Sequence, residues 1–154
     1  MGDRRIEVID DHAEIEIRVL SKPLYVCTVR RAIASLGESM GMDEDTCGNL
    51  ALAIGEAIVN VIEHGYGGDE DRPIWIKASP IRKDGRPGLE IVVEDECPGV
   101  DLSAIKSRPL DEVRPGGLGV HIIHRIMDEV DYSHREAGTG VRLRMRKFIN
   151  TSSQ

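Results

Sequence analysis

The chain has 154 residues, of which 40% are hydrophobic and 31% are charged, and its net charge is −7. This length predicts one domain that buries its own core without disulfides or metal. The acidic balance argues against non-specific binding to nucleic acid or to an anionic membrane. The sequence has no run of 18 apolar residues, and its N-terminus lacks the apolar centre of a signal peptide.

The three cysteines, Cys27, Cys47 and Cys97, are far apart in the sequence and form no C-x-x-C motif. This spacing is neither a disulfide framework nor a zinc signature, and it is typical of a reducing compartment. Together with the composition, it predicts a soluble, cytoplasmic protein.

The hydrophobic pattern predicts the order β-α-α-β-β-(α)-α-β-β between a charged, irregular stretch at 1–12 and a polar tail at 150–154. Ser21 is the expected cap of the first helix, with Pro23 in its first turn. In chain order we expect a strand at 14–20, helices at 21–36 and 43–64, hairpin strands at 73–82 and 88–94, a short helix near 102–107, a helix at 120–129 and strands at 130–135 and 141–146.

This order predicts one domain at 13–149. Its fold class is an α/β (α+β) two-layer sandwich, in which helices pack on one face of a mixed, largely antiparallel sheet.

The predicted second helix carries a polar edge beside an apolar one. Glu56, Asn60 and His64 are spaced by four residues, so they project from one side of the helix. Taken alone, this edge is more typical of a partly solvated helix than of a functional site. The neighbouring apolar stripe, which we expect to face the core, consists of Leu50, Ile54, Ala57, Ile58 and Val61.

Three glycine-bearing segments follow this helix, at 92–101, 116–119 and 138–140. In the first, Asp95 ends a buried strand before a tight turn, where it could accept a hydrogen bond from a ligand amine. In the second, backbone amides that open a helix favour phosphate. The third indicates only a turn. When each segment stands alone, an ordinary turn or loop is the more typical explanation.

In this order and spacing, however, the segments resemble the anti-sigma-factor serine/threonine kinases of the RsbW type, in the Bergerat-fold GHKL ATPase/kinase superfamily. GEAIVNVIEHGY at 55–66 is similar to the N box, and EDECPGVD at 94–101 to the first glycine box. PGGLGVHIIHRIMDEV at 115–130 is similar to the second box and its helix, and GTGVRL at 138–143 to the last box. The resemblance spans 14–147.

The resemblance implies a catalytic and a metal-binding residue on the second helix. Glu56 would be the general base that orients and deprotonates the attacking hydroxyl, because phosphoryl transfer depends mainly on positioning and charge neutralisation. Asn60 would bind Mg²⁺ through its oxygen and bridge it to the nucleotide phosphates. His64 matches the pattern, and we expect it to brace the helix end.

The resemblance also implies a nucleotide-binding set. Asp95 would accept from the adenine amine, Gly99 would let the base pack closely, and Thr139 would support the pocket. Arg114 is a candidate for the γ-phosphate, although a solvated loop arginine explains it equally well. The segment implied to bind the phosphates, mainly through backbone amides, comprises Gly116, Gly117, Leu118, Gly119 and Val120.

One position departs from the family pattern. The first glycine box usually reads D-x-G-x-G, and Cys97 stands here in place of its first glycine. A side chain at this position could crowd the base or require another backbone angle. A small buried filler is the expected role of Cys97, and a reactive thiol is the alternative.

The function implied by the resemblance is that of an ATP- and Mg²⁺-dependent protein serine/threonine kinase in a partner-switching pathway. Such a protein sequesters a sigma factor, phosphorylates a serine of an antagonist protein, and commonly works as a homodimer. The alternative is an ATP-binding module that sequesters a partner without phosphorylating it. A sensor histidine kinase fragment is disfavoured, because an ATP-binding domain would use the whole length.

Two further patterns have simpler explanations. His121 and His124 are spaced as a metal pair, but they fall opposite the apolar stripe of their helix, which predicts a solvated face. Arg142, Arg144 and Arg146 alternate along the last strand. We expect them on an exposed sheet face, and a docking surface for an acidic partner is the second interpretation.

Overall fold

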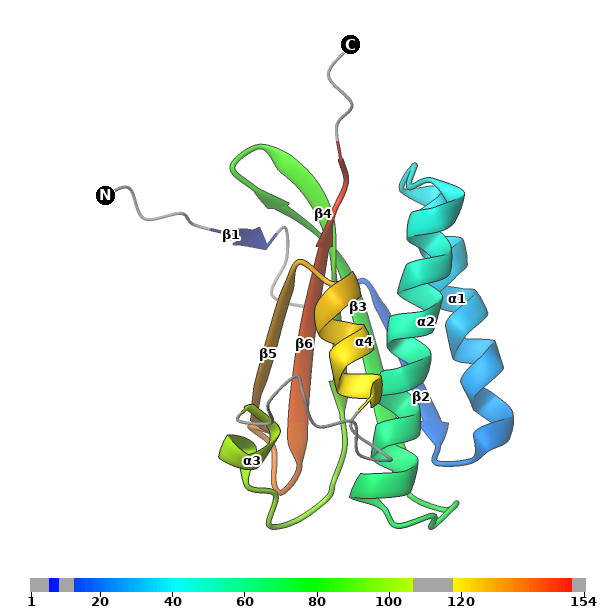
Figure 1. The fold of residues 1–154 in the computed structure, drawn as a ribbon, viewed down its shortest axis with the longest axis vertical. Helices are drawn as coiled ribbons and strands as arrows, with labels where there is room; N and C mark the ends of the chain where they lie inside the picture. Colours follow the sequence, from blue (N-terminus) through cyan, green and yellow to red (C-terminus); the bar gives the residue numbers. More distant parts are fainter. Residues whose placement is uncertain (1–5, 9–12, 107–117, 151–154) are drawn as a thin grey trace.

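The computed structural model describes residues 6–8, 13–106 and 118–150 (Figure 1). The order of its elements confirms the predicted succession, with one addition: a short strand lies within the stretch 1–12 that was expected to be irregular. The elements are β1 (Ile6–Val8), β2 (Ile15–Leu20), a 3₁₀ turn (Pro23–Tyr25), α1 (Val26–Ser39), α2 (Glu44–Asn60), a π-helical turn (Val61–Gly65), β3 (Pro73–Lys83), β4 (Arg86–Glu94), α3 (Leu102–Lys106), α4 (Leu118–Ile126), β5 (Glu129–His134) and β6 (Val141–Phe148).

The strands form one sheet in the spatial order β1-β3-β4-β6-β5, and β2 also pairs with β3. β1 and β2 share one edge of β3, because β2 pairs with its first half and β1 with its end. Every described pairing is antiparallel, so the parallel part of the expected mixed sheet is not found among these residues. The helices α1, α2 and α4 lie on one face, which confirms the two-layer sandwich (Figure 1).

The core lies between α2 and the inner face of the sheet. The alternation predicted for the three central strands is confirmed, since each expected inward residue is at most 8% exposed. On α2, the predicted stripe is buried except for Val61 at its end, which is only partly buried. The inward residues of β3, β4 and β6 are Ile74, Ile76, Ala78, Leu89, Ile91, Val93, Val141, Leu143 and Met145.

Local sequence signals determine two of the connections. Asp84 and Gly85 form the two-residue turn of the β3–β4 hairpin, with φ angles of 51° and 78°. Positive φ at both positions matches the twist of the strands that they join. Asp43 caps α2, because its carboxylate accepts a hydrogen bond of 2.7 Å from the amide of Thr46.

The predicted cap of α1 is wrong. Ser21 is fully buried, and its hydroxyl donates to the carbonyl of Asp69 (2.5 Å) and accepts from the amide of Arg72 (3.0 Å). α1 instead follows the 3₁₀ turn and has no side-chain cap. Ser21 therefore holds the β2–α1 junction against the loop that follows the π-helical turn.

The arginine row on β6 is also not the exposed row that was expected. Arg146 is 7% exposed and contacts Glu90 (2.7 Å) and Glu129 (3.2 Å) on the neighbouring strands. Opposite charges that face each other across strands stabilise a sheet by about 0.2–1 kcal/mol per pair. The two remaining arginines also lie opposite acids, in the pairs Arg144–Asp131 at 2.7 Å and Arg142–Glu94 at 3.6 Å.

Within the described ranges, one helix is long and apolar enough to cross a membrane by length and composition. It is Glu44–Gly65, with a mean hydropathy of 1.2, although Glu56 and Asn60 interrupt its apolar residues. Of its most apolar window, 56% is buried inside the protein. The central helix of a globular core commonly passes the same test.

We predict that Ser21→Ala lowers the free energy of unfolding by about 1–3 kcal/mol, because the buried Ser21 hydroxyl would no longer bind the amide of Arg72 and the carbonyl of Asp69. Urea denaturation followed by circular dichroism measures this change. Ser39→Ala is the matched control, since its hydroxyl is exposed and bonds only within α1. The control should change stability by less than about 0.5 kcal/mol. Equal stabilities of the two variants would contradict the role assigned to Ser21.

Candidate functional site

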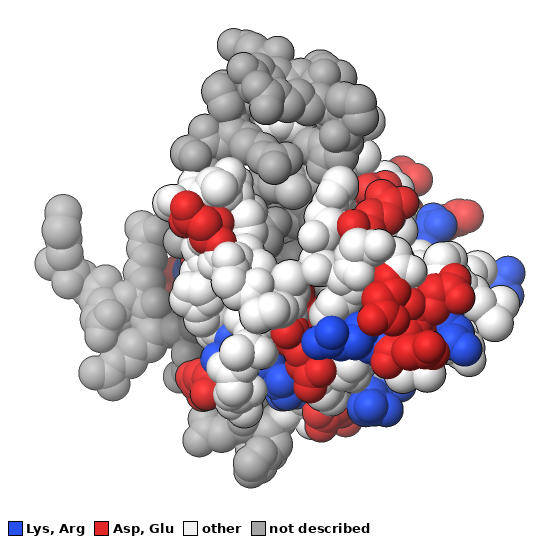
Figure 2. Space-filling view, turned by 90° about the horizontal axis from the view of Figure 1, so that it is seen from below, with Lys and Arg blue, Asp and Glu red and all other residues white. Residues whose placement is uncertain are grey.

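A pocket of about 210 Å³ lies where the end of α2 meets the ends of β4 and β6. Most of its wall is apolar, and its polar lining includes Asn60, His64, Asp95 and Cys97. Such a wall, with few polar groups, is typical of a small-molecule site. Figure 2 views the molecule from this end, where acidic side chains gather over the loop between the π-helical turn and β3.

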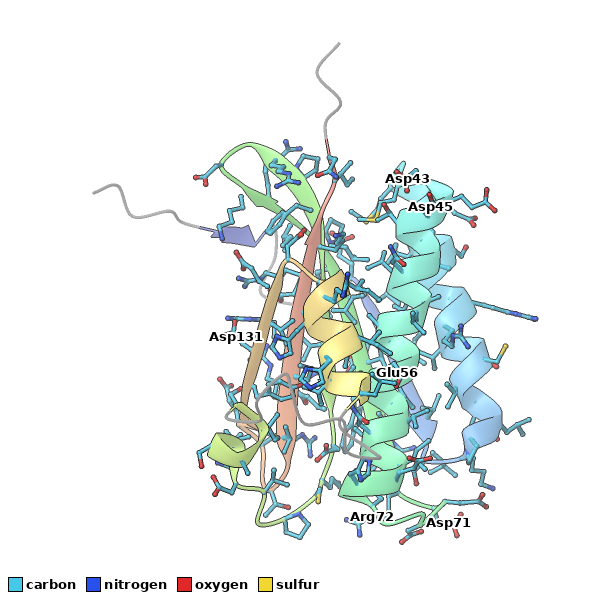
Figure 3. All side chains as sticks on the ribbon, in the orientation of Figure 1. Asp43, Asp45, Glu56, Asp71, Arg72 and Asp131 are labelled. Carbon is cyan, nitrogen blue, oxygen red and sulfur yellow. The ribbon has the colours of Figure 1, made fainter. Side chains whose placement is uncertain are left out.

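The polar edge of α2 lies against the start of α4. A Cβ atom on Gly119 would lie 2.6 Å from Oε2 of Glu56 and 3.3 Å from Oδ1 of Asn60. A side chain at this position would therefore displace the ends of the Glu56 and Asn60 side chains. Figure 3 shows Glu56 on the part of α2 that α4 approaches. The structure therefore brings together three predicted site residues from two different motifs.

Asp95 lies at the end of β4 in the pocket wall and is only 6% exposed. Its Oδ1 accepts hydrogen bonds from the amides of Cys97 (2.8 Å) and Val141 (3.1 Å). No bond to Oδ2 is found among the described residues, so this oxygen is available to a ligand. Burial raises the pKa of Asp95, while the two amides and the charge of Arg135 oppose that shift.

Gly140 is a site residue that the sequence analysis did not select. Its φ is 131°, and a Cβ atom there would lie 1.8 Å from the carbonyl oxygen of Asp95. This contact lets β6 begin beside the end of β4, where the amide of Asp95 donates to the carbonyl of Val141 at 3.1 Å. The pattern at 138–140 carried the signal, but Thr139 was selected from it.

Two predicted residues lie beside the pocket rather than in its wall. Thr139 is exposed, and its hydroxyl is 3.5 Å from the carbonyl oxygen of Glu96. Gly99 is exposed, with a φ of 71°, and no atom of the described residues lies within 4 Å of the position that a side chain would take. Their roles toward a bound base stay predictions.

Tyr66 was missed although it ends the first motif. Its hydroxyl donates to the carbonyl of Pro73 (2.6 Å) and accepts from the amide of Glu96 (2.7 Å). Burial raises the pKa of Tyr66 to about 12, so the hydroxyl stays protonated at neutral pH. Tyr66 thus joins the end of the π-helical turn to the turn that follows Asp95.

Cys97 does not strain the first glycine segment. Among the described residues, the non-glycine residue with positive φ is Asp84, so Cys97 has an ordinary backbone conformation. Its Sγ lies 2.9 Å from the carbonyl oxygen of Gly65, to which the thiol donates. The side chain forms part of the pocket wall, and burial and the charge of Asp95 raise the pKa of its thiol.

Of the remaining residues predicted for the site, three are described by the structure and three are not. Val120 lines the pocket and Leu118, at the start of α4, is 60% exposed. His64 lines the pocket, and no hydrogen bond from it to the helix end is found in the described chain. Arg114, Gly116 and Gly117 lie outside the described residues.

His124 is exposed as predicted, whereas His121 is half-buried. The ring of His124 lies 6.4 Å from that of Tyr132. In the part of the chain that is described, no group of three metal-binding side chains is found.

A core helix with a polar edge, an antiparallel sheet and a buried acid facing a pocket define an α/β sandwich with a small-molecule pocket. Residues 19–147 match the histidine kinase-like ATPase domain. The serine-protein kinase RsbW of Oceanobacillus iheyensis is 31% identical over 143 residues, which cover 88% of this chain and 86% of the relative. RsbW of Listeria monocytogenes is 31% identical over 147 residues, covering 90% and 89%. RsbW of Bacillus subtilis is 28% identical over 144 residues, covering 88% and 86%.

The chain belongs to the histidine kinase-like ATPase domain family and, within it, to the RsbW serine-protein kinases. The predicted resemblance and fold class are thus confirmed.

Two solved structures have the same fold. The SiaB–SiaC complex from Pseudomonas aeruginosa matches with a TM-score of 0.59 at 14% identity, covering 90% of each chain. The RsbU and RsbW domains of Rv1364c from Mycobacterium tuberculosis match with a TM-score of 0.57 at 17% identity, covering 88% of this chain and 31% of that one.

We predict that Gly119→Ala weakens ATP binding by roughly fivefold or more, because the added methyl group would displace the Glu56 and Asn60 side chains, and such overpacking costs about 1–3 kcal/mol. Isothermal titration calorimetry measures the affinity. Gly48→Ala is the control: Gly48 is exposed on α2, has no neighbour within 4 Å among the described residues, and its substitution should stabilise the helix by about 0.5–1 kcal/mol without changing affinity. A Gly119→Ala protein that binds ATP as the parent does would contradict the contact's importance.

Proposed function

We propose that this protein is an ATP- and Mg²⁺-dependent serine kinase that acts in the cytoplasm as an anti-sigma factor in a partner-switching pathway. Its kinase domain comprises 13–149. It sequesters a sigma factor and phosphorylates a serine of an antagonist protein. The phosphorylated antagonist then releases the kinase, which binds the sigma factor again. The observation that carries the proposal is the contact of Glu56 and Asn60 with Gly119, beside a pocket that ends at Asp95.

Glu56 and Asn60 fit complementary roles in phosphoryl transfer. The carboxylate of Glu56 orients the attacking serine hydroxyl and accepts its proton. The side-chain oxygen of Asn60 suits Mg²⁺, a hard cation that takes few protein ligands together with nucleotide phosphates. When bound, Mg²⁺ neutralises charge on those phosphates. Glu56 and Asn60 both approach the same point on α4, so the base and the metal ligand would share one centre.

The opposite end of the pocket suits adenine. Oδ2 of Asp95, to which no described residue donates, can accept a hydrogen bond from the exocyclic amine, while Oδ1 accepts from two backbone amides. The first turn of α4, with Gly119 and Val120, offers amides and a positive helix end to the phosphates. We also assign Arg114, Gly116, Gly117 and Leu118 to the phosphates, and Gly99 and Thr139 to the base.

The partners follow from the family. Relatives of this chain are serine-protein kinases, and a protein of the same fold was solved in complex with a partner, SiaC. We propose an antagonist protein and a sigma factor as the partners, and a homodimer as the working form. The ordinary backbone of Cys97 removes one reason to prefer a non-phosphorylating module.

Glu56→Gln should abolish transfer yet leave ADP binding within about twofold of the parent, since it removes the base but keeps the shape of the side chain. Asn60→Ala should weaken Mg²⁺-dependent nucleotide binding as well. Labelled ATP with a candidate antagonist measures transfer, and calorimetry measures binding. Transfer by Glu56→Gln at the parent rate would show that the base assignment is wrong, and binding without transfer by the parent would contradict the kinase.

Asp95→Asn should lower ATP affinity by roughly tenfold or more, because a buried donor would face the donating adenine amine. Its amide oxygen can still accept from the two backbone amides. The variant should nevertheless be as stable as the parent or more so at pH 7, since no buried charge remains. ATP binding at the parent affinity would contradict the acceptor role.

The difference in free energy of unfolding between the parent and Asp95→Asn should depend on pH. The folded state raises the pKa of Asp95, so it binds the proton more tightly than the unfolded chain does. The parent therefore gains stability relative to Asp95→Asn as pH falls, and loses it as pH rises through the folded pKa. Urea denaturation of both proteins across the acidic range measures this, and a difference that does not vary with pH would contradict the shift.

A further inference from the structure

Two of the chain segments that line the proposed nucleotide pocket meet at one corner. One is the π-helical turn Val61–Gly65, which continues α2 directly after Asn60. The other is the turn after β4, which carries Asp95 and Cys97. The thiol of Cys97 joins them, because it donates to the carbonyl of Gly65 at an Sγ–O distance of 2.9 Å.

This bond satisfies a carbonyl that a helix end leaves unpaired. The last carbonyls of a helix have no partner within it. Here the carbonyl of Val61 accepts from the amide of Tyr66, and that of Ile62 from the amide of Gly68, each at 2.8 Å. The carbonyl of Gly65 accepts from the Cys97 thiol instead. A residue at 97 without a donor would leave that carbonyl without this partner.

The corner also contains the carboxylate that faces the ligand. A Cβ atom on Gly65 would lie 3.7 Å from Cβ of Cys97 and 4.0 Å from Oδ2 of Asp95. The Asp95 side chain is buried, and the described residues offer no hydrogen bond to this oxygen. The Cys97 thiol, the Gly65 carbonyl and Oδ2 of Asp95 therefore lie close together. We expect a change at the thiol to alter the position of the oxygen that would bind the ligand.

We propose that Cys97 is a positioning residue of the nucleotide pocket. Its hydrogen bond to Gly65, called the clasp below, holds the turn that bears Asp95 against the end of the helix that bears Asn60. Modification of this thiol and nucleotide binding therefore exclude each other. The proposal rests on the proposed ATP site. Burial raises the pKa of this thiol, so little thiolate is present at neutral pH and reaction should be slow while the clasp is closed.

The parent and two variants distinguish a hydrogen-bonding role of Cys97 from a role as a side chain that only fills space. Cys97→Ser keeps a hydroxyl donor, whereas Cys97→Ala keeps a small side chain without one. If the bond contributes about 1 kcal/mol to positioning Asp95, Cys97→Ala should bind ATP roughly fivefold more weakly. Cys97→Ser should stay within about twofold of the parent. A filler role predicts instead that Cys97→Ala binds as the parent does.

Thiol labelling tests whether modification of Cys97 and nucleotide binding exclude each other. In the reaction with N-ethylmaleimide, Sγ forms a bond to a ring carbon, the thiol proton ends on the neighbouring carbon, and no group leaves. Saturating ATP with Mg²⁺ should slow labelling of Cys97 at least about fivefold, and the labelled protein should no longer bind ATP. Cys27, which is exposed, is the internal control and should label equally with and without ATP. Peptide mapping by mass spectrometry follows each thiol separately.

The outcomes distinguish this inference from the proposed function. A parent protein that does not bind ATP would overturn both. A parent that binds ATP, but whose Cys97 labels at the same rate with and without it, would overturn the inference alone. Unchanged ATP affinity of Cys97→Ala would do so too.

Discussion

The close approach of α4 to α2 is the contact on which the site depends. Because Gly119 has no side chain, the start of α4 touches Glu56 and Asn60 directly. The opposite edge of α2 is buried against the sheet and α1, so the helix cannot rotate without exposing its apolar stripe. Burying each large apolar side chain contributes about 1.5–3 kcal/mol. The core thereby positions the polar edge, and three of its residues, Ala57, Val93 and Leu143, also form part of the pocket wall.

The site contains groups that oppose folding as well as groups that support it. Burial disfavours the charged form of Asp95, and two backbone amides and Arg135 partly offset that effect. Gly140 imposes a second constraint on folding, because its backbone lies so close to the carbonyl of Asp95 that no side chain fits there. Both features act at the same place, where β4 ends and β6 begins. They are consistent with a carboxylate retained for ligand recognition rather than for stability.

Hydrogen bonds between distant segments complete the pocket end of the molecule. Ser21 holds the loop that follows the π-helical turn, Tyr66 holds the amide of Glu96, and Cys97 holds the carbonyl of Gly65. Local rules misassigned Ser21, because a serine before a proline fits a helix start as well as it fits a loop contact. They missed Tyr66 because nothing near it in the sequence reveals its partners.

The sequence by itself determined the order of the elements, the inward residues of the central strands, the β3–β4 turn and the polar edge of α2. These features depend on periodicity and on neighbours within a few residues, which are visible in one chain segment. Its motifs also indicated the family, and with it Glu56, Asn60 and Asp95. Only the tertiary structure decided that Arg146 is buried between two acids, that Gly119 touches Glu56, and that Gly140 and Cys97 help to build the pocket. Each of these depends on strand order or on helix packing, which bring together residues far apart in the sequence.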